Sequence, residues 1–130
     1  MHAQEQIDRL LAKARQDARI LAVILFGSVA RAEQTAHSDI DVYLVLHVHR
    51  YTPLELSRFK LDHLGEADLD VRVFQQLPLY VRRRVLKEGQ VVFSRDDGAL
   101  YELAFRTTRA FARFKTIYDT YLDEVAGAGS

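Results

Sequence analysis

The sequence contains no cysteine. A chain without cysteine can form neither a disulfide framework nor a zinc site built on thiolates, and it has no thiol nucleophile. An excess of positive charge is also missing, because 18 Lys and Arg balance 18 Asp and Glu. Proteins that bind nucleic acid or anionic membranes through bulk charge carry such an excess. We therefore expect no direct contact with nucleic acid, and any anion site must be local.

Long hydrophobic runs are absent as well. The longest strongly apolar stretch, residues 20–26, is far shorter than the ~20 residues that span a bilayer. The first residues lack the basic and apolar regions of a signal peptide, so we expect a cytoplasmic protein that does not contact a membrane. The length of 130 residues and the 48% hydrophobic content predict one domain over residues 1–130, with a disordered tail at 126–130.

The periodicity of the apolar residues predicts an α/β (α+β) domain. Three- and four-residue spacing and the positions of Pro and Gly predict helices over residues 3–19, 29–33, 54–64, 78–87 and 98–125. Short runs rich in branched residues predict strands over residues 20–26, 40–46, 70–74 and 91–93. Strands separated by helices indicate a mixed sheet flanked by helices, with a long C-terminal helix.

Two carboxylates lie at the head of the second predicted strand. Asp39 and Asp41 are two residues apart, so their side chains point to the same side with Cα atoms roughly 6.5 Å apart. Such a pair repels unless a cation lies between the two groups, and Mg²⁺ prefers oxygen ligands of this kind. Asp70 would add a third carboxylate if its strand lies beside the second, with Asp68 in its place if the register shifts by two. Three carboxylates around one or two metal ions suit in-line displacement at phosphorus.

The turn after the first predicted strand offers a site for anions. Glycine at Gly27-Ser28 allows close approach to a phosphate, and free amides at a helix start favour anions. Arg31 could add a fork of donors, and we assign Ser38 to the same nucleotide site. Taken alone, a Gly-Ser turn is most often only a turn, and an Asp pair at a strand start is usually solvated. Together they indicate a nucleoside triphosphate bound with Mg²⁺.

These residues resemble a known family. Gly27-Ser28, ten intervening residues and Asp39-Ile40-Asp41 match the G-S-x10-D-x-D signature of the DNA polymerase beta nucleotidyltransferase superfamily. Residues 26–31 match its small F-G-S-x-A-R form. The chain is most similar to the minimal nucleotidyltransferases, the MNT antitoxins of HEPN/MNT toxin-antitoxin pairs.

The resemblance implies a role for each residue of the motif. Gly27 and Ser28 would hold the triphosphate of ATP, and Asp39 and Asp41 would coordinate Mg²⁺. Asp70 would be the third carboxylate and the base for the acceptor hydroxyl. The implied activity is transfer of AMP from ATP to a tyrosine of the cognate HEPN toxin, a ribonuclease, with release of pyrophosphate.

Two other functions remain open at this point. The chain could be an antitoxin that masks its toxin stoichiometrically, without turnover. It could instead transfer a nucleotide to a small-molecule hydroxyl, as the aminoglycoside nucleotidyltransferases do, although those enzymes usually carry an additional helical domain.

The closing helix has more apolar residues than one face needs. One stripe can pack on the sheet and consists of Leu100, Ala104, Phe111, Tyr118 and Val125. Others lie partly off that face, namely Phe105, Phe114, Ile117 and Tyr121. Either the core face is wide, or the toxin or a second copy of the chain covers these side chains. The basic run Arg82-Arg83-Arg84 with Lys87 is either a solvated helix face or part of such a contact.

Overall fold

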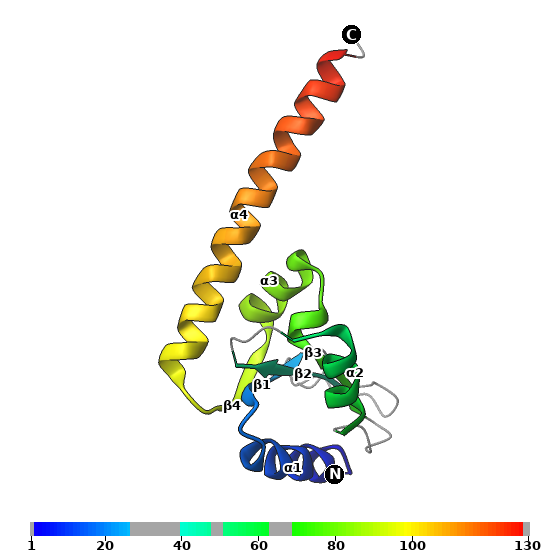
Figure 1. Cartoon of the computed structure of the whole chain (residues 1–130), viewed down its shortest axis with the longest axis vertical. Coiled ribbons are helices and arrows are strands. Elements are labelled where there is room, and N and C mark those ends of the chain that lie inside the picture. Colours follow the sequence, from blue (N-terminus) through cyan, green and yellow to red (C-terminus); the bar gives the residue numbers. More distant parts are fainter. Residues whose placement is uncertain (1, 27–39, 48–50, 63–68, 129–130) are drawn as a thin grey trace.

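A computed structural model of the chain describes residues 2–26, 40–47, 51–62 and 69–128. Its four strands form one mixed sheet in the order β3-β2-β1-β4, with β2 and β3 parallel and the other neighbours antiparallel (Figure 1). The strands are β1 (Ile20–Phe26), β2 (Ile40–Leu46), β3 (Leu69–Val73) and β4 (Gln90–Ser94). The predicted mixed sheet is confirmed, and each predicted strand is correct to within a residue at its ends.

Four helices and one short turn complete the described chain. The helices are α1 (His2–Gln16), α2 (Pro53–Asp62), α3 (Leu79–Glu88) and α4 (Asp97–Ala128). A 3-10 turn, Phe74–Gln76, follows β3, so the prediction that Phe74 ends the strand is wrong. The N–H of Leu77 donates to the carbonyl of Phe74 at 3.1 Å, and this turn buries both side chains. The predicted helix at 29–33 lies outside the described residues.

Two helix ends differ from the prediction by three residues, and the other ends differ by one or two. Helix α1 ends at Gln16 rather than at residue 19, because the carboxylate of Asp17 accepts a hydrogen bond from the N–H of Arg19 at 3.0 Å. Helix α4 extends to Ala128 and so includes the first residues of the expected tail. Gly129 and Ser130 lie outside the described residues.

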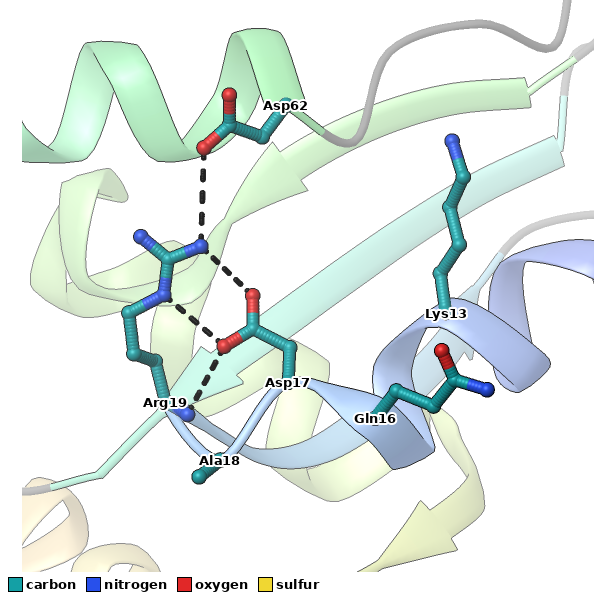
Figure 2. Close-up of a pocket in the computed structure, with 6 residues that line it drawn as sticks. All are labelled: Lys13, Gln16, Asp17, Ala18, Arg19 and Asp62. Carbon is teal, nitrogen blue, oxygen red and sulfur yellow. Dashed lines mark hydrogen bonds and ion pairs between the residues drawn. The ribbon is translucent and has the colours of Figure 1, made fainter.

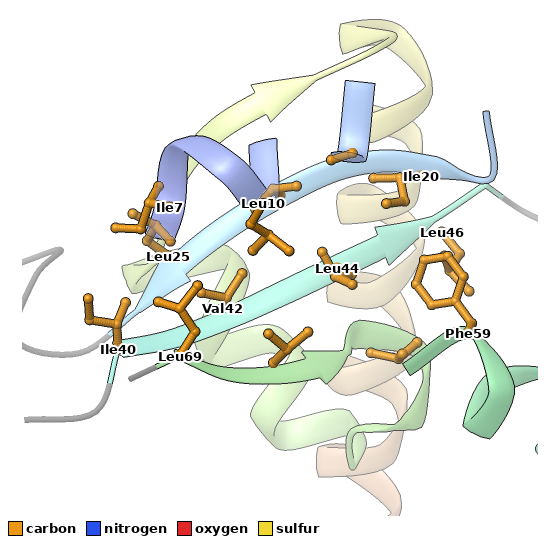
Figure 3. Close-up of a cluster of buried hydrophobic side chains, with 14 residues drawn as sticks. Ile7, Leu10, Ile20, Leu25, Ile40, Val42, Leu44, Leu46, Phe59 and Leu69 are labelled. Carbon is orange, nitrogen blue, oxygen red and sulfur yellow. The ribbon is translucent and has the colours of Figure 1, made fainter. Parts of the chain in front are cut away.

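The sheet is covered on both faces, which explains the continuous apolar sequence of its central strands β1 and β2. Helices α1 and α2 cover one face, where Ile7, Leu10 and Phe59 pack against the strands (Figure 3). Helix α3 and the start of α4 cover the other face through Val85 and Leu103. Each such side chain contributes roughly 1.5–3 kcal/mol by leaving water.

Arg95 joins the end of β4 to the end of α1. Its guanidinium donates to the carbonyls of Ile20 at 2.9 Å, Ala14 at 2.9 Å, Arg15 at 3.0 Å and Asp17 at 3.2 Å. The carbonyls at a helix C-terminus lack partners within the helix, and a cation there also favours the helix dipole. One side chain therefore holds β4, α1 and the start of β1 together.

Helix α4 extends away from the rest of the molecule (Figure 1). Among its residues 97–127, only Leu103 and Thr107 are buried, and Leu100 packs partly against the core. The prediction that Tyr118 and Val125 pack on the sheet is wrong, because these side chains are half exposed. A helix of 32 residues is about 48 Å long, more than twice the length of a seven-residue strand. Within the described ranges, no helix is both long and apolar enough to cross a membrane.

The backbone at Gly89, the C-cap of α3, packs tightly against neighbouring atoms. A Cβ at this position would lie 2.5 Å from Cγ2 of Ile24 and 2.5 Å from the carbonyl oxygen of Val85. We predict that Gly89→Ala lowers the free energy of unfolding by about 1–3 kcal/mol, because buried groups would have to move. Urea denaturation measures the loss. As a control, Gly98→Ala in α4 meets no atom closer than 3.4 Å and should leave stability unchanged or raise it by up to about 1 kcal/mol.

Candidate active site

The parallel pairing of β2 and β3 brings two carboxylates together. Asp41 is the register partner of Asp70. Partners in a parallel pair lie on the same face of the sheet, and here it is the face opposite Val42 and Val71, which point into the core under α1 and α2. The condition set for Asp70, that its strand lies beside the second strand, is thus met. Both aspartates are partly exposed.

The remaining predicted site residues lie outside the described residues: Gly27, Ser28, Arg31, Ser38, Asp39 and the alternative Asp68. The residues that flank this segment are described. Phe26, at the end of β1, is the antiparallel partner of Asp41 in β2. The described residues on either side of 27–39 therefore lie together, at the end of the central strands where the carboxylates are found.

Arg72 holds the carboxylate of Asp70. Its Nε and Nη2 donate to Oδ2 of Asp70 at 3.2 and 3.0 Å. These hydrogen bonds and the charge of Asp70 raise the pKa of Arg72 above its usual value. Because both side chains are partly exposed, with 52% of Arg72 and 35% of Asp70 accessible, the pair orients the carboxylate more than it stabilises the fold.

Tyr43 is buried beside these groups and is the register partner of Arg72. Its ring meets Phe26 edge-on, with centroids 6.2 Å apart. Burial is the main cause that raises the pKa of the Tyr43 phenol, and the charge of Asp41 raises it further. Asp70 acts in the same direction, while Arg72 and Arg84 oppose it. The pKa of the phenol therefore depends on both carboxylates and both guanidinium groups.

Arg84 brings a second cation to this edge from helix α3. Its guanidinium carbon lies 5.4 Å from the centre of the Phe26 ring, the residue directly before Gly27. Its Nε also donates to Glu88 at 3.0 Å, and the Arg84 side chain is 61% exposed. An anion near Phe26 would thus find an accessible cation.

The donor set fits a hard divalent cation. Two adjacent carboxylates on one sheet face supply oxygen ligands, which Mg²⁺ prefers. Among the described residues no cluster of three metal-ligating side chains occurs. The predicted third member, Asp39, is not one of those residues.

A pocket of about 360 Å³ lies at the opposite end of β1, beside Asp17, Arg19 and Asp62 (Figure 2). Arg19 donates to Asp17 at 2.7 Å and lies 3.6 Å from Asp62, so its charge is already balanced. Since a seven-residue strand spans ~20 Å, this pocket is separate from the carboxylate pair.

The sequence pattern assigns no site role to Arg72 and Tyr43, and it places Arg84 only in a basic run that is either a solvated helix face or part of a partner contact. The alternation in β3 places Arg72 on the face of Asp70, so its proximity was predictable. The position of Arg84 beside Phe26 depends on how α3 packs on the sheet. No local pattern within the basic run distinguishes it from Arg82 or Arg83.

Comparison with known proteins adds a family to this geometry. A family model described as "Polymerase beta, Nucleotidyltransferase" matches residues 5–98. A protein of Methanocaldococcus jannaschii that carries the provisional name of a protein adenylyltransferase is 39% identical over 75 residues. That match covers 58% of this chain and 57% of the relative, so the chain spans little more than half of the relative's length.

Two solved structures share the fold. A chain in the crystal structure of a toxin-antitoxin with AMP-PNP has a TM-score of 0.67 and 16% identity, over 93% of this chain and 96% of that one. A chain in the structure of a tri-AMPylated Shewanella oneidensis HEPN toxin in complex with MNT antitoxin has a TM-score of 0.64 and 15% identity, over 96% and 98%. At this identity the likeness concerns the fold.

The charges around Tyr43 give a test that needs no ligand. We predict that Asp41→Asn lowers the pKa of the Tyr43 phenol, because one of the negative charges that oppose its ionisation is removed. The measurement is an ultraviolet pH titration of each protein, with the curve of the matching Tyr43→Phe variant subtracted. Asp119→Asn on distant α4 serves as the control. An unchanged Tyr43 titration in Asp41→Asn would contradict this arrangement of the site.

Proposed function

Because the chain belongs to the polymerase beta nucleotidyltransferase family, we propose that it transfers AMP from ATP to a tyrosine of a cognate HEPN toxin and so acts as an antitoxin. The observation that carries the proposal is the pairing of Asp41 with Asp70 on one sheet face, beside the guanidinium groups of Arg72 and Arg84. The name of the adenylyltransferase relative and the shared fold with the toxin-antitoxin structures support the choice of a protein acceptor.

The transfer makes one bond and breaks one. The tyrosine oxygen attacks the α-phosphorus of ATP, and the bond from that phosphorus to the oxygen bridging the β-phosphate breaks, so that pyrophosphate leaves. We assign the proton of the tyrosine hydroxyl to the carboxylate of Asp70. Arg72 donates both of its hydrogen bonds to Oδ2, which fixes the carboxylate and leaves Oδ1 as the proton acceptor.

Asp41 and Asp70, with Asp39, are the residues that would hold Mg²⁺. When bound, the ion supplies Lewis-acid stabilisation of the negative charge on the phosphates. We propose Gly27, Ser28, Arg31 and Ser38 for the nucleotide and add Arg84, whose exposed guanidinium lies over Phe26 next to Gly27. A cation at this position favours binding of the triphosphate.

The exposure of Asp70 and Arg72 bears on the kind of acceptor that can reach them. The side chains of Asp70 and Arg72 remain 35% and 52% exposed at the edge strand β3. A tyrosine on the surface of another protein can approach such an edge. A small hydroxyl compound would instead need an enclosing pocket to hold it in position.

We predict that Asp41→Asn and Asp70→Asn each reduce AMP transfer by at least about a hundredfold, because each removes a charge from the reacting centre. The assay incubates the protein with ATP labelled at the α-phosphate, Mg²⁺ and the candidate HEPN protein, and follows label on the toxin. Asp8→Asn is the matched control, since Asp8 is an exposed carboxylate on α1. Circular dichroism establishes that each variant is folded.

Three outcomes would overturn the proposal. Labelling that survives both substitutions would remove the catalytic assignment. Neutralisation of the toxin only at equal molar amounts, without label, would identify an antitoxin that masks its toxin. Label on an aminoglycoside but not on protein would identify a small-molecule transferase.

We further predict that Arg84→Ala weakens binding of AMP-PNP about tenfold, because a charge-assisted contact to phosphate contributes roughly 1.5–3 kcal/mol. Isothermal titration calorimetry with Mg²⁺ measures the affinity. Arg106→Ala is a matched control, since Arg106 forms an ion pair of the same spacing with Glu102 on α4 as Arg84 forms with Glu88. Equal affinities of the two variants would exclude Arg84 from the nucleotide site.

A further inference from the structure

Tyr80 is an exposed aromatic residue on the helix that carries Arg84. It lies in the first turn of α3 and is 65% exposed. Leu77 and Val81 on either side of it pack in the core, so the packing of the fold does not require an aromatic ring at position 80. Among the described residues, none forms a ring contact or a side-chain hydrogen bond with Tyr80. The ring is therefore available to a ligand.

Arg84 lies one turn further along the same flank of α3. Residues four apart on a helix lie one above the other, with Cβ atoms roughly 5–6 Å apart. The guanidinium of Arg84 lies over Phe26, and it is one of the charges that act on the pKa of Tyr43, which burial chiefly raises. This flank of α3 therefore faces the side of the sheet that carries the carboxylates.

The course of the chain sets the order of Tyr80 and Arg84 along the sheet. Strand β3 begins beside the start of β2 and ends at Val73, away from the carboxylates. Helix α3 then returns toward them, because Gly89 at its end lies against Ile24 near the end of β1. Tyr80 is therefore further from the carboxylates than Arg84 is, by about 6 Å along the helix axis.

We propose that the base of the bound nucleotide stacks on the ring of Tyr80, so that α3 holds the nucleotide at two points. Arg84 binds the phosphates, and Tyr80 binds the base. This inference rests on the proposed nucleotidyl transfer and concerns the part of the nucleotide that the carboxylates do not contact. The residues that carry it, Tyr80 and Arg84, are both exposed and share one helix flank.

The shape of a nucleotide suits this order of groups. The base lies one ribose ring beyond the α-phosphate, which the proposed reaction places at Asp41 and Asp70. A nucleotide that extends from there along the sheet passes Arg72, which lies two residues beyond Asp70 on the same face and is 52% exposed. Two residues of a strand span roughly 6.6 Å, which matches the offset of Tyr80 from Arg84 along α3.

Stacking also gives the site a preference among nucleotides. Every base has a π-face, so an aromatic ring accepts any of them, and the affinity increases with the strength of stacking. The two fused rings of a purine cover more of the tyrosine ring than the single ring of a pyrimidine does. We therefore expect a purine nucleoside triphosphate to bind more tightly than a pyrimidine one.

Removal of the ring tests the proposal in the absence of any toxin. With Mg²⁺ and AMP-PNP in isothermal titration calorimetry, Tyr80→Ala should weaken binding about tenfold, because base–aromatic stacking is lost. Tyr80→Phe should restore the affinity, since the stacking face needs no hydroxyl. Tyr101→Ala is the matched control, because Tyr101 is a similarly exposed ring, at 75%, on α4. Circular dichroism establishes that each variant is folded.

Inorganic tripolyphosphate separates the base from the phosphates. Tyr80→Ala should bind tripolyphosphate as tightly as the unmodified chain does, whereas Arg84→Ala should bind both AMP-PNP and tripolyphosphate more weakly. The ratio of the affinities for AMP-PNP and its uridine counterpart, UMP-PNP, should be above one in the unmodified chain and should fall toward one in Tyr80→Ala.

Two results would overturn the proposal. Equal weakening of AMP-PNP and tripolyphosphate by Tyr80→Ala would show that the ring supports α3 rather than the base. Unchanged AMP-PNP affinity in Tyr80→Ala would remove Tyr80 from the nucleotide site, including the case in which only labelling of the toxin falls. That case would identify Tyr80 as a contact of the protein acceptor.

The outcome is distinguishable from failure of the proposed function. Base-dependent binding that is lost in Tyr80→Ala, without any label on the toxin, would retain the stacking role and exclude the AMP transfer. Labelling that needs Asp41 and Asp70 but is accompanied by unchanged AMP-PNP affinity in Tyr80→Ala would retain the transfer and exclude the stacking role.

Discussion

The structure of the site depends on the parallel pairing of β2 with β3. This pairing fixes Asp41 opposite Asp70, and a shift by one residue would turn one of the two carboxylates into the core. A parallel neighbour requires a crossover connection, which here includes α2, whose Phe59 packs under the sheet. The apolar residues on the sheet face under α1 and α2 thus determine where the carboxylates lie on the opposite face. Packing on one face sets the geometry of the chemistry on the other.

The two neighbouring negative charges of Asp41 and Asp70 lie near two arginines that come from different elements of the chain. Arg72 comes from the same strand as Asp70 and holds one carboxylate oxygen. Arg84 comes from α3 and opposes the effect of Asp41 on Tyr43. The carboxylates also remain partly exposed, which limits the desolvation penalty of two neighbouring negative charges. The same exposure keeps them accessible to a nucleotide and an acceptor.

Local pattern was sufficient to predict the strands of the mixed sheet, because alternation and branched residues report directly on strands. The adjacency of Asp41 and Asp70 depends in addition on the strand order and register, which local pattern left open. Local pattern was also not sufficient for features set by tertiary contacts. Phe74 continues the alternation of β3 but begins a 3-10 turn, which packs Phe74 and Leu77 in the same core cluster. Arg84 resembles its neighbours in sequence and differs only in facing Phe26. The length of α4 was predicted, but its outward course depends on the packing of Leu103 in its first turns against the sheet, a tertiary contact that periodicity does not report.

Helix α3 contacts both the end of the sheet that carries the carboxylates and helix α4. Arg84 lies over Phe26 beside the carboxylates. The preceding residue, Arg83, has its guanidinium carbon 4.6 Å from the ring centre of Phe111 on α4. Helix α3 therefore lies between the Phe111 region of α4 and the carboxylate site. Since α3 also buries Val85 against the sheet, it is held as a rigid element between them.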